Sequence, residues 1–298
     1  MSKEDLLALI RRKESQGQRA RFYPLGQTLN PECYIEVLDV MGDERDIVQA
    51  ARVSYAACSK PSTPEKDRAL IRYLLRNRHT SPFEQVEIKF RIKLPIFVER
   101  QWARHRAASW NEVSARYTEL PEETYNPERW CEQSTSNKQG SGQHVRDPGQ
   151  MQAAYESGVR VAFSNYKYQL ANGLAKEQAR MVLPLSTLTE KIWKTDGNNF
   201  LKFLSLRQHP HAQYEIRMYA NVMCGILSDW MPNVWDAYYD YDHRAMTFSA
   251  LELPLLAKCV DLNALSSLAE RVESKGEYQT IVEFIRRYRS EGVCEEGD

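Results

Sequence analysis

One segment restricts the fold more than any other: VEIKFRIKLP, at residues 86–95, alternates apolar and charged side chains without interruption. The apolar positions are Val86, Ile88, Phe90, Ile92 and Leu94. Because successive side chains of a strand point to opposite faces, the pattern predicts a β-strand. One face of this strand is expected to be buried, and the charged face is expected to lie against water.

Helical patterns lie on both sides of the predicted strand. In residues 63–79, Thr63 is a predicted N-cap and Pro64 occupies the first turn, while apolar residues share one face. Pro95 ends the strand and suits the start of a following helix. Together, the periodic segments predict helices at residues 43–55, 63–79, 96–106, 150–170, 177–183, 200–206 and 211–230. Residues 118–148 are rich in Ser, Asn, Gln and Gly and are expected to form a mobile loop or lid.

The overall charge of the chain is balanced, with 40 Lys and Arg against 40 Asp and Glu. This balance argues against a general nucleic-acid binder. With 298 residues and 42% hydrophobic composition, the chain can form one large domain or two smaller ones. No apolar run approaches the roughly 20 residues that span a bilayer, and the N-terminal sequence is too charged for a signal peptide. We therefore expect a cytoplasmic protein without a membrane segment.

The cysteines and histidines do not form a recognisable metal motif. No CxxC pair occurs, and the spacings are not those of a zinc site, so reduced and mostly structural thiols are expected. His209 and His211 form an HPH pair, but further ligands are not evident nearby, which favours a structural or ligand-facing role over a metal site. The six cysteines are Cys33, Cys58, Cys131, Cys224, Cys259 and Cys294.

A cluster of cations stands out in this neutral chain. The segment RHRAASWNEVSARY contains Arg104, His105, Arg106 and Arg116 against the single carboxylate of Glu112. Guanidinium groups pair bidentately with phosphate and carboxylate, so the cluster indicates a small anionic ligand, with a solvated charged face as the alternative. If the three consecutive residues end a helix, they point about 100° apart and are able to touch two adjacent ligands.

The end of the same segment and several missing motifs narrow the choice of ligand site. Ser114 and Arg116 lie two residues apart, and an extended backbone would place both on one side as a phosphate clamp. The chain has neither GxGxxG after a strand nor GxxxxGK[ST], and it lacks a GxSxG elbow. A nucleotide would therefore be held by side chains.

The spacing RHR, seven residues, Ser resembles the signature of the flavin-dependent thymidylate synthases. The resemblance runs from about Tyr34 to Tyr241 through AARVSY, RHTSPFE, LPIFVERQWARHR, EQARMVLPL, FLSLR and HAQYEIR. It implies synthesis of dTMP from dUMP with 5,10-methylenetetrahydrofolate, bound FAD and NADPH. It also implies a homotetramer with shared active sites and an α/β (α+β) fold, in which helices surround a mostly antiparallel sheet and there is no Rossmann domain.

The resemblance implies a division of the chain and a role for each matching residue. The predicted divisions are an N-terminal extension at residues 1–33, the synthase domain at 34–241 and a helical C-terminal extension at 242–298, with amphipathic helices at 251–272 and 278–289. The dUMP positions are Gln101, Arg104, Glu112, Ser114, Ala115, Arg116, Arg180 and Arg207. The FAD positions are Ser54, Ser81, Glu84, Arg104, His105, Arg106, Ala107, Asn111, Glu112, Asp196, Asn198, Lys202 and His211. The folate-side positions are His79 and Tyr117.

Arg207 is the predicted catalytic residue. Uracil C5 must become electron-rich before it attacks a one-carbon unit, and a guanidinium that stabilises charge at N3 and its flanking carbonyls would promote this. The nearby stretch KTDGNNFLKFLSLR departs from the family, because many members carry Asn and Arg where this chain has Asp196, Asn198 and Lys202. We expect Lys202 to meet a phosphate of FAD and Asp196 to add a negative charge beside one.

Several of these residues also have ordinary structural explanations. Arg180 is placed to cap a helix or pair with Glu177, and His79 to terminate a helix. Ser81 suits a turn before a proline, and His211 suits a helix start. Two other functions stay open: methylation of UMP on the same fold, and a non-catalytic nucleotide-binding or RNA-binding module in which arginines alternate with aromatic residues.

Overall fold

The computed structural model describes residues 21–54, 62–135, 138–262, 265 and 275–291. The chain divides into two compact units, Met1–Arg244 and Ala245–Asp298. The domain boundaries predicted from the sequence remain predictions. Of the cysteines, Cys58 and Cys294 lie outside the described residues, whereas burial raises the pKa of the Cys33 and Cys224 thiols to about 12.

A five-stranded sheet forms the centre of the first unit, in the order β1-β2-β3-β7-β4. Every neighbouring pair is antiparallel, which confirms the predicted α/β class with a mostly antiparallel sheet. The alternating segment of the sequence forms β3, as predicted. The strands are β1 at Arg21–Phe22, β2 at Tyr34–Met41, β3 at Glu87–Pro95, β4 at Ser109–Glu112 and β7 at Leu188–Asp196.

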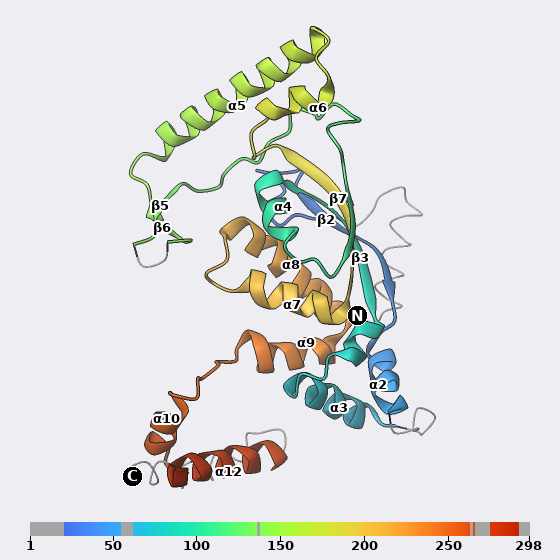
Figure 1. Cartoon of the computed structure of the whole chain (residues 1–298), viewed down its shortest axis with the longest axis vertical. Helices are drawn as coiled ribbons and strands as arrows, with labels where there is room; N and C mark the ends of the chain where they lie inside the picture. The colour runs from blue at the N-terminus through green and yellow to red at the C-terminus, as the bar shows by residue number, and fades with distance from the viewer. Residues whose placement is uncertain (1–20, 55–61, 136–137, 263–264, 266–274, 292–298) are drawn as a thin grey trace, which may run out of the picture. The chain divides into compact units, whose positions relative to one another are not determined.

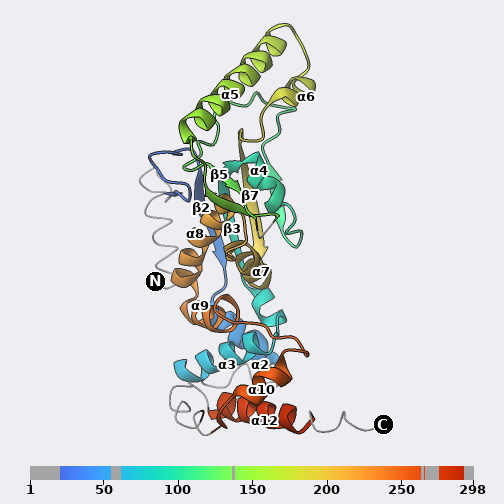
Figure 2. The ribbon, with the colours of Figure 1, turned by 90° about the vertical axis from the view of Figure 1, so that its left-hand side faces the viewer.

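The predicted helices form with small changes at their ends. The predicted N-cap is confirmed, because the Thr63 side chain accepts a hydrogen bond from the Lys66 N–H and Pro64 begins the helix. The helices of the first unit are α2 at Glu44–Val53, α3 at Pro64–Arg76, η1 at Ser81–Gln85, α4 at Ile96–Trp102, α5 at Pro148–Ala171, α6 at Lys176–Ala179, η2 at Arg180–Val182, α7 at Gly197–Gln208, α8 at Tyr214–Trp230, α9 at Pro232–Tyr238 and the π-helical turn η3 at Tyr239–His243. Helices α5 and α6 lie side by side (Figures 1 and 2).

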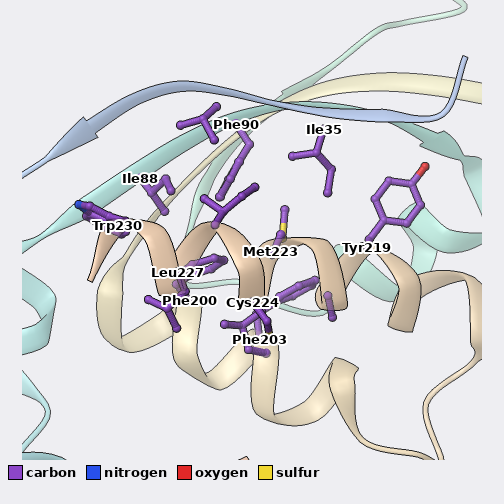
Figure 3. Close-up of a cluster of buried hydrophobic side chains, with 14 of the residues drawn as sticks. Ile35, Ile88, Phe90, Phe200, Phe203, Tyr219, Met223, Cys224, Leu227 and Trp230 are labelled. Atoms are coloured by element: carbon purple, nitrogen blue, oxygen red, sulfur yellow. The ribbon is translucent and has the colours of Figure 1, made fainter. Parts of the chain in front are cut away.

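The main core lies between the sheet and the helices α7 and α8, which pack against each other (Figure 1). Every third or fourth residue of α8 points inward, as an amphipathic helix requires. Figure 3 shows the aromatic rings of α7 and the side chains of α8 beneath those of β2 and β3. The labelled residues of this core are Ile35, Ile88, Phe90, Phe200, Phe203, Tyr219, Met223, Cys224, Leu227 and Trp230, all buried.

The opposite face of the sheet carries charge pairs. On β3, Arg91 donates to the buried Glu36 of β2 at 3.3 Å, and Lys93 pairs with Glu123 at 2.6 Å. The charged side chains of β3 are half-buried by such partners, so the expectation of a water-facing side was only partly right.

Strand β7 was not predicted, because its polarity is inverted. Lys191 points into the core and is 2% exposed, whereas Ile192 on the other face is 39% exposed. An alternating pattern read by hydrophobicity assigns these two residues to the wrong faces.

Three local expectations were wrong. The helix predicted at residues 96–106 ends at Trp102, since the Arg104 and His105 N–H groups bond to carbonyls three residues back and tighten the last turn. The segment around Ser114 turns instead of extending, because the Ser114 carbonyl accepts from the Tyr117 N–H at 3.0 Å. The predicted loop contains a polar hairpin of β5 at Cys131–Gln133 and β6 at Ser141–His144.

The second unit contains α10 at Leu253–Cys259 and α12 at Lys275–Glu291. These two helices pack together, and Arg289 of α12 donates from Nε to the carbonyl of Ala257 at 2.8 Å. The helix predicted at 278–289 is confirmed, while most of the second half of the one predicted at 251–272 lies outside the described residues. Among the helices that the structure describes, none is both long and apolar enough to cross a bilayer.

Candidate active site

The segment that follows α4 forms one wall of a pocket of about 340 Å³. Strand β7 supplies the floor and α7 supplies the other wall, so the segment meets two consecutive elements that lie far from it in the sequence. The pocket contains three cations, and no carboxylate is among its described lining residues, which favours an anionic ligand. It is lined by Arg104, His105, Arg106, Ala107, Trp193, Thr195, Asn199 and Lys202.

Arg207, in the last turn of α7, is directed at this segment. Its Nε donates to Nε2 of His105 at 2.9 Å, and one of its terminal nitrogens donates to the Gln101 carbonyl at 2.8 Å. The Gln101 side chain in turn donates to Gln213, just before α8. Three predicted residues from two motifs, Gln101 and His105 from one and Arg207 from the other, are therefore joined in one hydrogen-bonded group.

The hydrogen bond from Arg207 defines the protonation of His105. Because Nε2 accepts this bond, the imidazole is neutral and carries its proton on Nδ1. Burial lowers the pKa of His105 to about 4, with further lowering by the charges of Arg207 and Lys191. Burial also lowers the pKa of Arg207. At neutral pH His105 is a hydrogen-bond acceptor for Arg207, and the positive charge of the pair lies on Arg207.

Aromatic rings support this group from beneath. His105 meets the edge of Phe203 at 4.9 Å between ring centres, and Phe203 lies against Trp102 at 4.4 Å. Trp102 also packs on Trp193 at 5.4 Å. Phe203, Trp102 and Trp193 are all buried. The position of His105 is therefore fixed by close packing.

The predicted dUMP turn forms a second group at the end of β4. Arg116 pairs with Glu177 of α6 at 3.2 Å, and Arg180 donates to the Glu177 carbonyl at 3.3 Å. The Ser114 hydroxyl accepts from the Arg116 N–H at 3.3 Å. Among the described residues, no hydrogen bond or ion pair joins this group to that of Arg207. Within one chain, the predicted dUMP residues therefore form two groups.

Further predicted FAD residues meet where α7 begins. Asn198 is buried and donates to Glu84 of η1 at 3.0 Å. Asp196 is the N-cap of α7: its two carboxylate oxygens accept from the N–H and the side-chain amide of Asn199, at 2.9 and 2.7 Å. Asp196 thus has a structural role that the sequence analysis did not assign, and of the three residues that depart from the family, Asp196, Asn198 and Lys202, it is Lys202 that lines the pocket.

Gly197 explains how closely α7 approaches η1. A Cβ at this position would lie 2.7 Å from the carbonyl oxygen of Phe83 and 2.8 Å from a methyl group of Val86. Only glycine allows this contact without a shift of backbone, so Gly197 brings Asn198 within reach of Glu84.

The remaining predicted residues lie apart from the pocket. Ser54 caps the C-terminal end of α2, and Ser81 begins η1. His79 lies edge-on to Tyr73 after α3, with ring centres 5.7 Å apart. His211 lines a separate polar cavity of about 380 Å³ beside the β5–β6 hairpin.

Three other predicted residues flank the groups described above. Tyr117 is 78% exposed, and Asn111 is exposed on the edge strand β4. Ala115 is buried in the turn of the dUMP group.

Some residues of the site were missed by the sequence analysis. Trp193, Thr195 and Asn199 line the pocket, and Thr189 donates to Glu112 at 2.7 Å. The signal for Thr189, Trp193 and Thr195 was the two-residue spacing of β7, which places them on one face. The inverted polarity of that strand hid the signal.

The comparisons with known proteins agree with this geometry. A family model described as thymidylate synthase complementing protein matches residues 36–233. The chain is 45% identical over 232 residues to a flavin-dependent thymidylate synthase of Wolbachia pipientis, which covers 76% of this chain and 81% of the relative. It is 46% identical over 249 residues to a protein of the same name from Thermus thermophilus, covering 82% and 91%.

Solved structures give the same result for the fold. The chain resembles a UMP/dUMP methylase of Streptomyces cacaoi bound with 5-Br dUMP, with a TM-score of 0.67 and 33% identity, over 70% of this chain and 96% of the other. The same methylase bound with 5-Br UMP matches with a TM-score of 0.64 and 32% identity, over 72% and 96%.

Proposed function

The chain belongs to the flavin-dependent thymidylate synthase family, and on that premise we propose that it methylates dUMP reductively to dTMP. The carbon donor is methylenetetrahydrofolate, the bound cofactor is FAD and the reductant is NADPH. The observation that carries the proposal is the cationic pocket at the RHR segment, with Arg207 directed at His105 on its border.

The pocket suits the phosphates of a dinucleotide cofactor. Arg104, Arg106 and Lys202 supply three cations, and the exposed guanidinium groups match phosphate oxygens bidentately. We assign these three side chains to FAD. When bound, FAD supplies the hydride-transfer chemistry of the reaction.

The second group suits the phosphate of dUMP. Ser114, Arg116 and Arg180 offer a hydroxyl and two guanidinium groups around one turn. Arg116 is held by Glu177 through an exposed ion pair, and such a pair contributes little to stability, so a phosphate can replace it at small cost.

Arg207 is the residue that acts on the uracil ring. Its guanidinium is half-buried, so charge developing at N3 and the adjacent carbonyl is stabilised more strongly than in water. The Nε of Arg207 donates to His105, and one of its terminal nitrogens donates to the Gln101 carbonyl, so the guanidinium is held in a fixed orientation. This orientation also fixes the direction of the other terminal nitrogen and the remaining N–H bonds.

The separation of the two dUMP groups supports a homotetramer with shared active sites. In such an assembly, Arg207 of one subunit completes the Ser114 and Arg116 group of another. Exposed apolar side chains near the turn, Tyr117, Met181 and Leu185, supply a surface for subunit contact. Sedimentation velocity of the full chain measures this directly, and a monomer at micromolar concentration would contradict the shared site.

The function is tested with the purified chain, FAD and dUMP. We expect bound FAD, anaerobic bleaching of its visible absorption by NADPH, and dTMP formation when methylenetetrahydrofolate is added. Arg106→Ala should weaken FAD binding, whereas Arg100→Ala, an exposed arginine on α4 that does not line the pocket, serves as the matched control. A colourless protein that binds no added FAD and instead binds RNA in a salt-dependent way would overturn the proposal.

Methylation of UMP is a second candidate, because the related methylase has been solved with 5-Br dUMP and with 5-Br UMP. The two substrates differ only at the 2′ position of the sugar. Measuring kcat/KM for both in the same assay decides between them, since a site that excludes the 2′-hydroxyl should favour dUMP by about 10-fold or more.

A further inference from the structure

A charge pair lies in the core directly behind the RHR segment. Lys191, in the middle of β7, is 2% exposed, and Glu99 of α4 is 4% exposed. Their side chains form an ion pair. Burial acts on both groups, lowering the pKa of Lys191 to about 8 and raising the pKa of Glu99.

Stability alone does not explain this pair. Removing two charges from water is costly, and buried ion pairs are often replaced by apolar residues without loss of stability. The neighbouring positions of the same core are filled by aliphatic and aromatic side chains, so an apolar pair would suit the surroundings. We therefore expect the pair to act on the residues that lie next to it.

On one side, Lys191 contacts the aromatic rings that pack beneath His105. Its Nζ lies 4.4 Å from the ring centre of Trp102, a cation–π distance. Trp102 packs on Phe203, and Phe203 on His105. Two packed aromatic rings, Trp102 and Phe203, thus connect the charge of Lys191 to the imidazole.

On the other side, Lys191 faces the edge strand. Glu112 of β4 lies directly opposite Lys191 in the antiparallel register, and opposite residues project on the same face of a sheet. Thr189, two residues from Lys191, donates to Glu112 at 2.7 Å. Thr189 therefore holds the Glu112 carboxylate by a hydrogen bond, and Lys191 acts on it through charge alone.

We propose that Lys191, balanced by Glu99, is a positioning residue of the active site: its ammonium keeps His105 uncharged as the acceptor for Arg207 and attracts the Glu112 carboxylate that Thr189 holds. This inference rests on the proposed function for the meaning of the site. The cations near His105 are Arg104 and Arg106 on its own segment, Arg207 and Lys202 on α7 and Lys191 on β7, and the carboxylates that act on Lys191 are Glu99 on α4 and Glu112 on β4. Lys191 forms an ion pair with Glu99 and interacts with Glu112 through charge, which leaves His105 among cations.

The test removes the charges without leaving either one unpaired. In Lys191→Met/Glu99→Gln the side chains keep similar lengths, so the core remains filled. We expect the NMR titration of His105, followed at ring Cε1 in the FAD-loaded full chain, to move upward by about 0.5 to 1 pH unit. The acid limb of kcat for dTMP formation should move in the same direction. Lys191→Arg keeps the charge and should retain the low titration of His105.

The matched control is Lys194→Met on the same strand. Lys194 lies on the opposite face and pairs with Glu87 at 2.7 Å, so its removal should leave the His105 titration unchanged. The resonance is assigned by its absence in His105→Gln.

Each outcome decides the inference. A folded double variant with an unshifted His105 titration overturns it, and so does a wild-type His105 that titrates near its ordinary value of about 6.5. If the double variant does not fold, the same measurement is made on Lys191→Gln/Glu99→Gln, which keeps a hydrogen-bonding pair, alongside the wild-type titration. If the wild-type protein forms no dTMP and the double variant still shifts the His105 titration, the proposed function is overturned and the positioning role stays intact.

Discussion

Arg207 is the residue whose replacement separates chemistry from stability. Arg207→Ala should lower kcat for dTMP formation by about 100-fold or more, the effect of losing a preorganised donor to developing charge. Reduction of FAD by NADPH, apart from any stimulation by bound dUMP, does not need that charge and should survive. Both rates are measured on the same preparation under anaerobic conditions.

The comparison variant is Arg207→Lys, which keeps a cation in the last turn of α7. An ammonium complements the helix dipole but cannot present the same planar set of donors to Nε2 of His105 and the Gln101 carbonyl. We therefore expect Lys to restore the melting temperature and not the rate. Near-normal dTMP synthesis in Arg207→Ala would assign the residue to the helix end alone.

His105 makes the stability of the protein depend on pH in a defined window. Its pKa is about 4 in the fold, through burial and the nearby Arg207, against about 6.5 in an unfolded chain. Between these values the unfolded state binds more protons, so stability rises with pH and is lost as pH falls from 6.5 towards 4. Melting temperatures across this range should fall less steeply in His105→Gln than in the wild type. Parallel curves for the two proteins would contradict the burial of a neutral imidazole.

At the scale of elements, Gly197 sets the contact between α7 and η1. Gly197→Ala places a methyl group against the Phe83 carbonyl and should destabilise the fold by about 1 to 3 kcal/mol. A methyl group added at Gly158, inside α5, would meet no heavy atom within 4 Å, so Gly158→Ala should stabilise by about 0.5 to 1 kcal/mol. Denaturant unfolding of both variants measures the difference, and equal effects would show that the contact at Gly197 relaxes freely.

The elements that the sequence predicted are those whose local pattern agrees with their surroundings. Strand β3 alternates strictly, and α3 has both its cap residue and its proline. Strand β7 was not predicted, because Lys191 is buried through its ion pair with Glu99. Glu99 lies 92 positions away, so a local sequence window does not contain both residues. The β5–β6 hairpin is built almost entirely from polar residues, so it lacks the apolar alternation that identifies a strand.

The RHR segment and Arg207 were identified by motif, and the structure joins them through one hydrogen bond. The capping role of Asp196 was within reach of the sequence, because Asp before a glycine-led helix is a common N-cap. The early end of α4 depends on two backbone hydrogen bonds that side-chain patterns do not encode.

At the scale of the whole molecule, the first unit has a core of its own. The main cluster of buried residues runs from Leu25 to Tyr238, so every member lies within Met1–Arg244. A chain ending at Arg244 should therefore fold, bind FAD and keep its dTMP activity within about 3-fold of the full chain. Circular dichroism, FAD titration and the dTMP assay check this. Loss of FAD binding by a folded truncated chain would assign the second unit to the active site.

The buried pair of Lys191 and Glu99 also restricts how this protein can diverge. Losing either charge alone leaves the other unpaired in the core, at a typical cost of about 3 to 5 kcal/mol, whereas replacing both charges together is often neutral for stability. Descendants that drop one charge would be removed by selection before the second change arises. Across the family, we expect these two positions to be inherited as a unit, so that lineages carry both charges or two uncharged residues and seldom one of each.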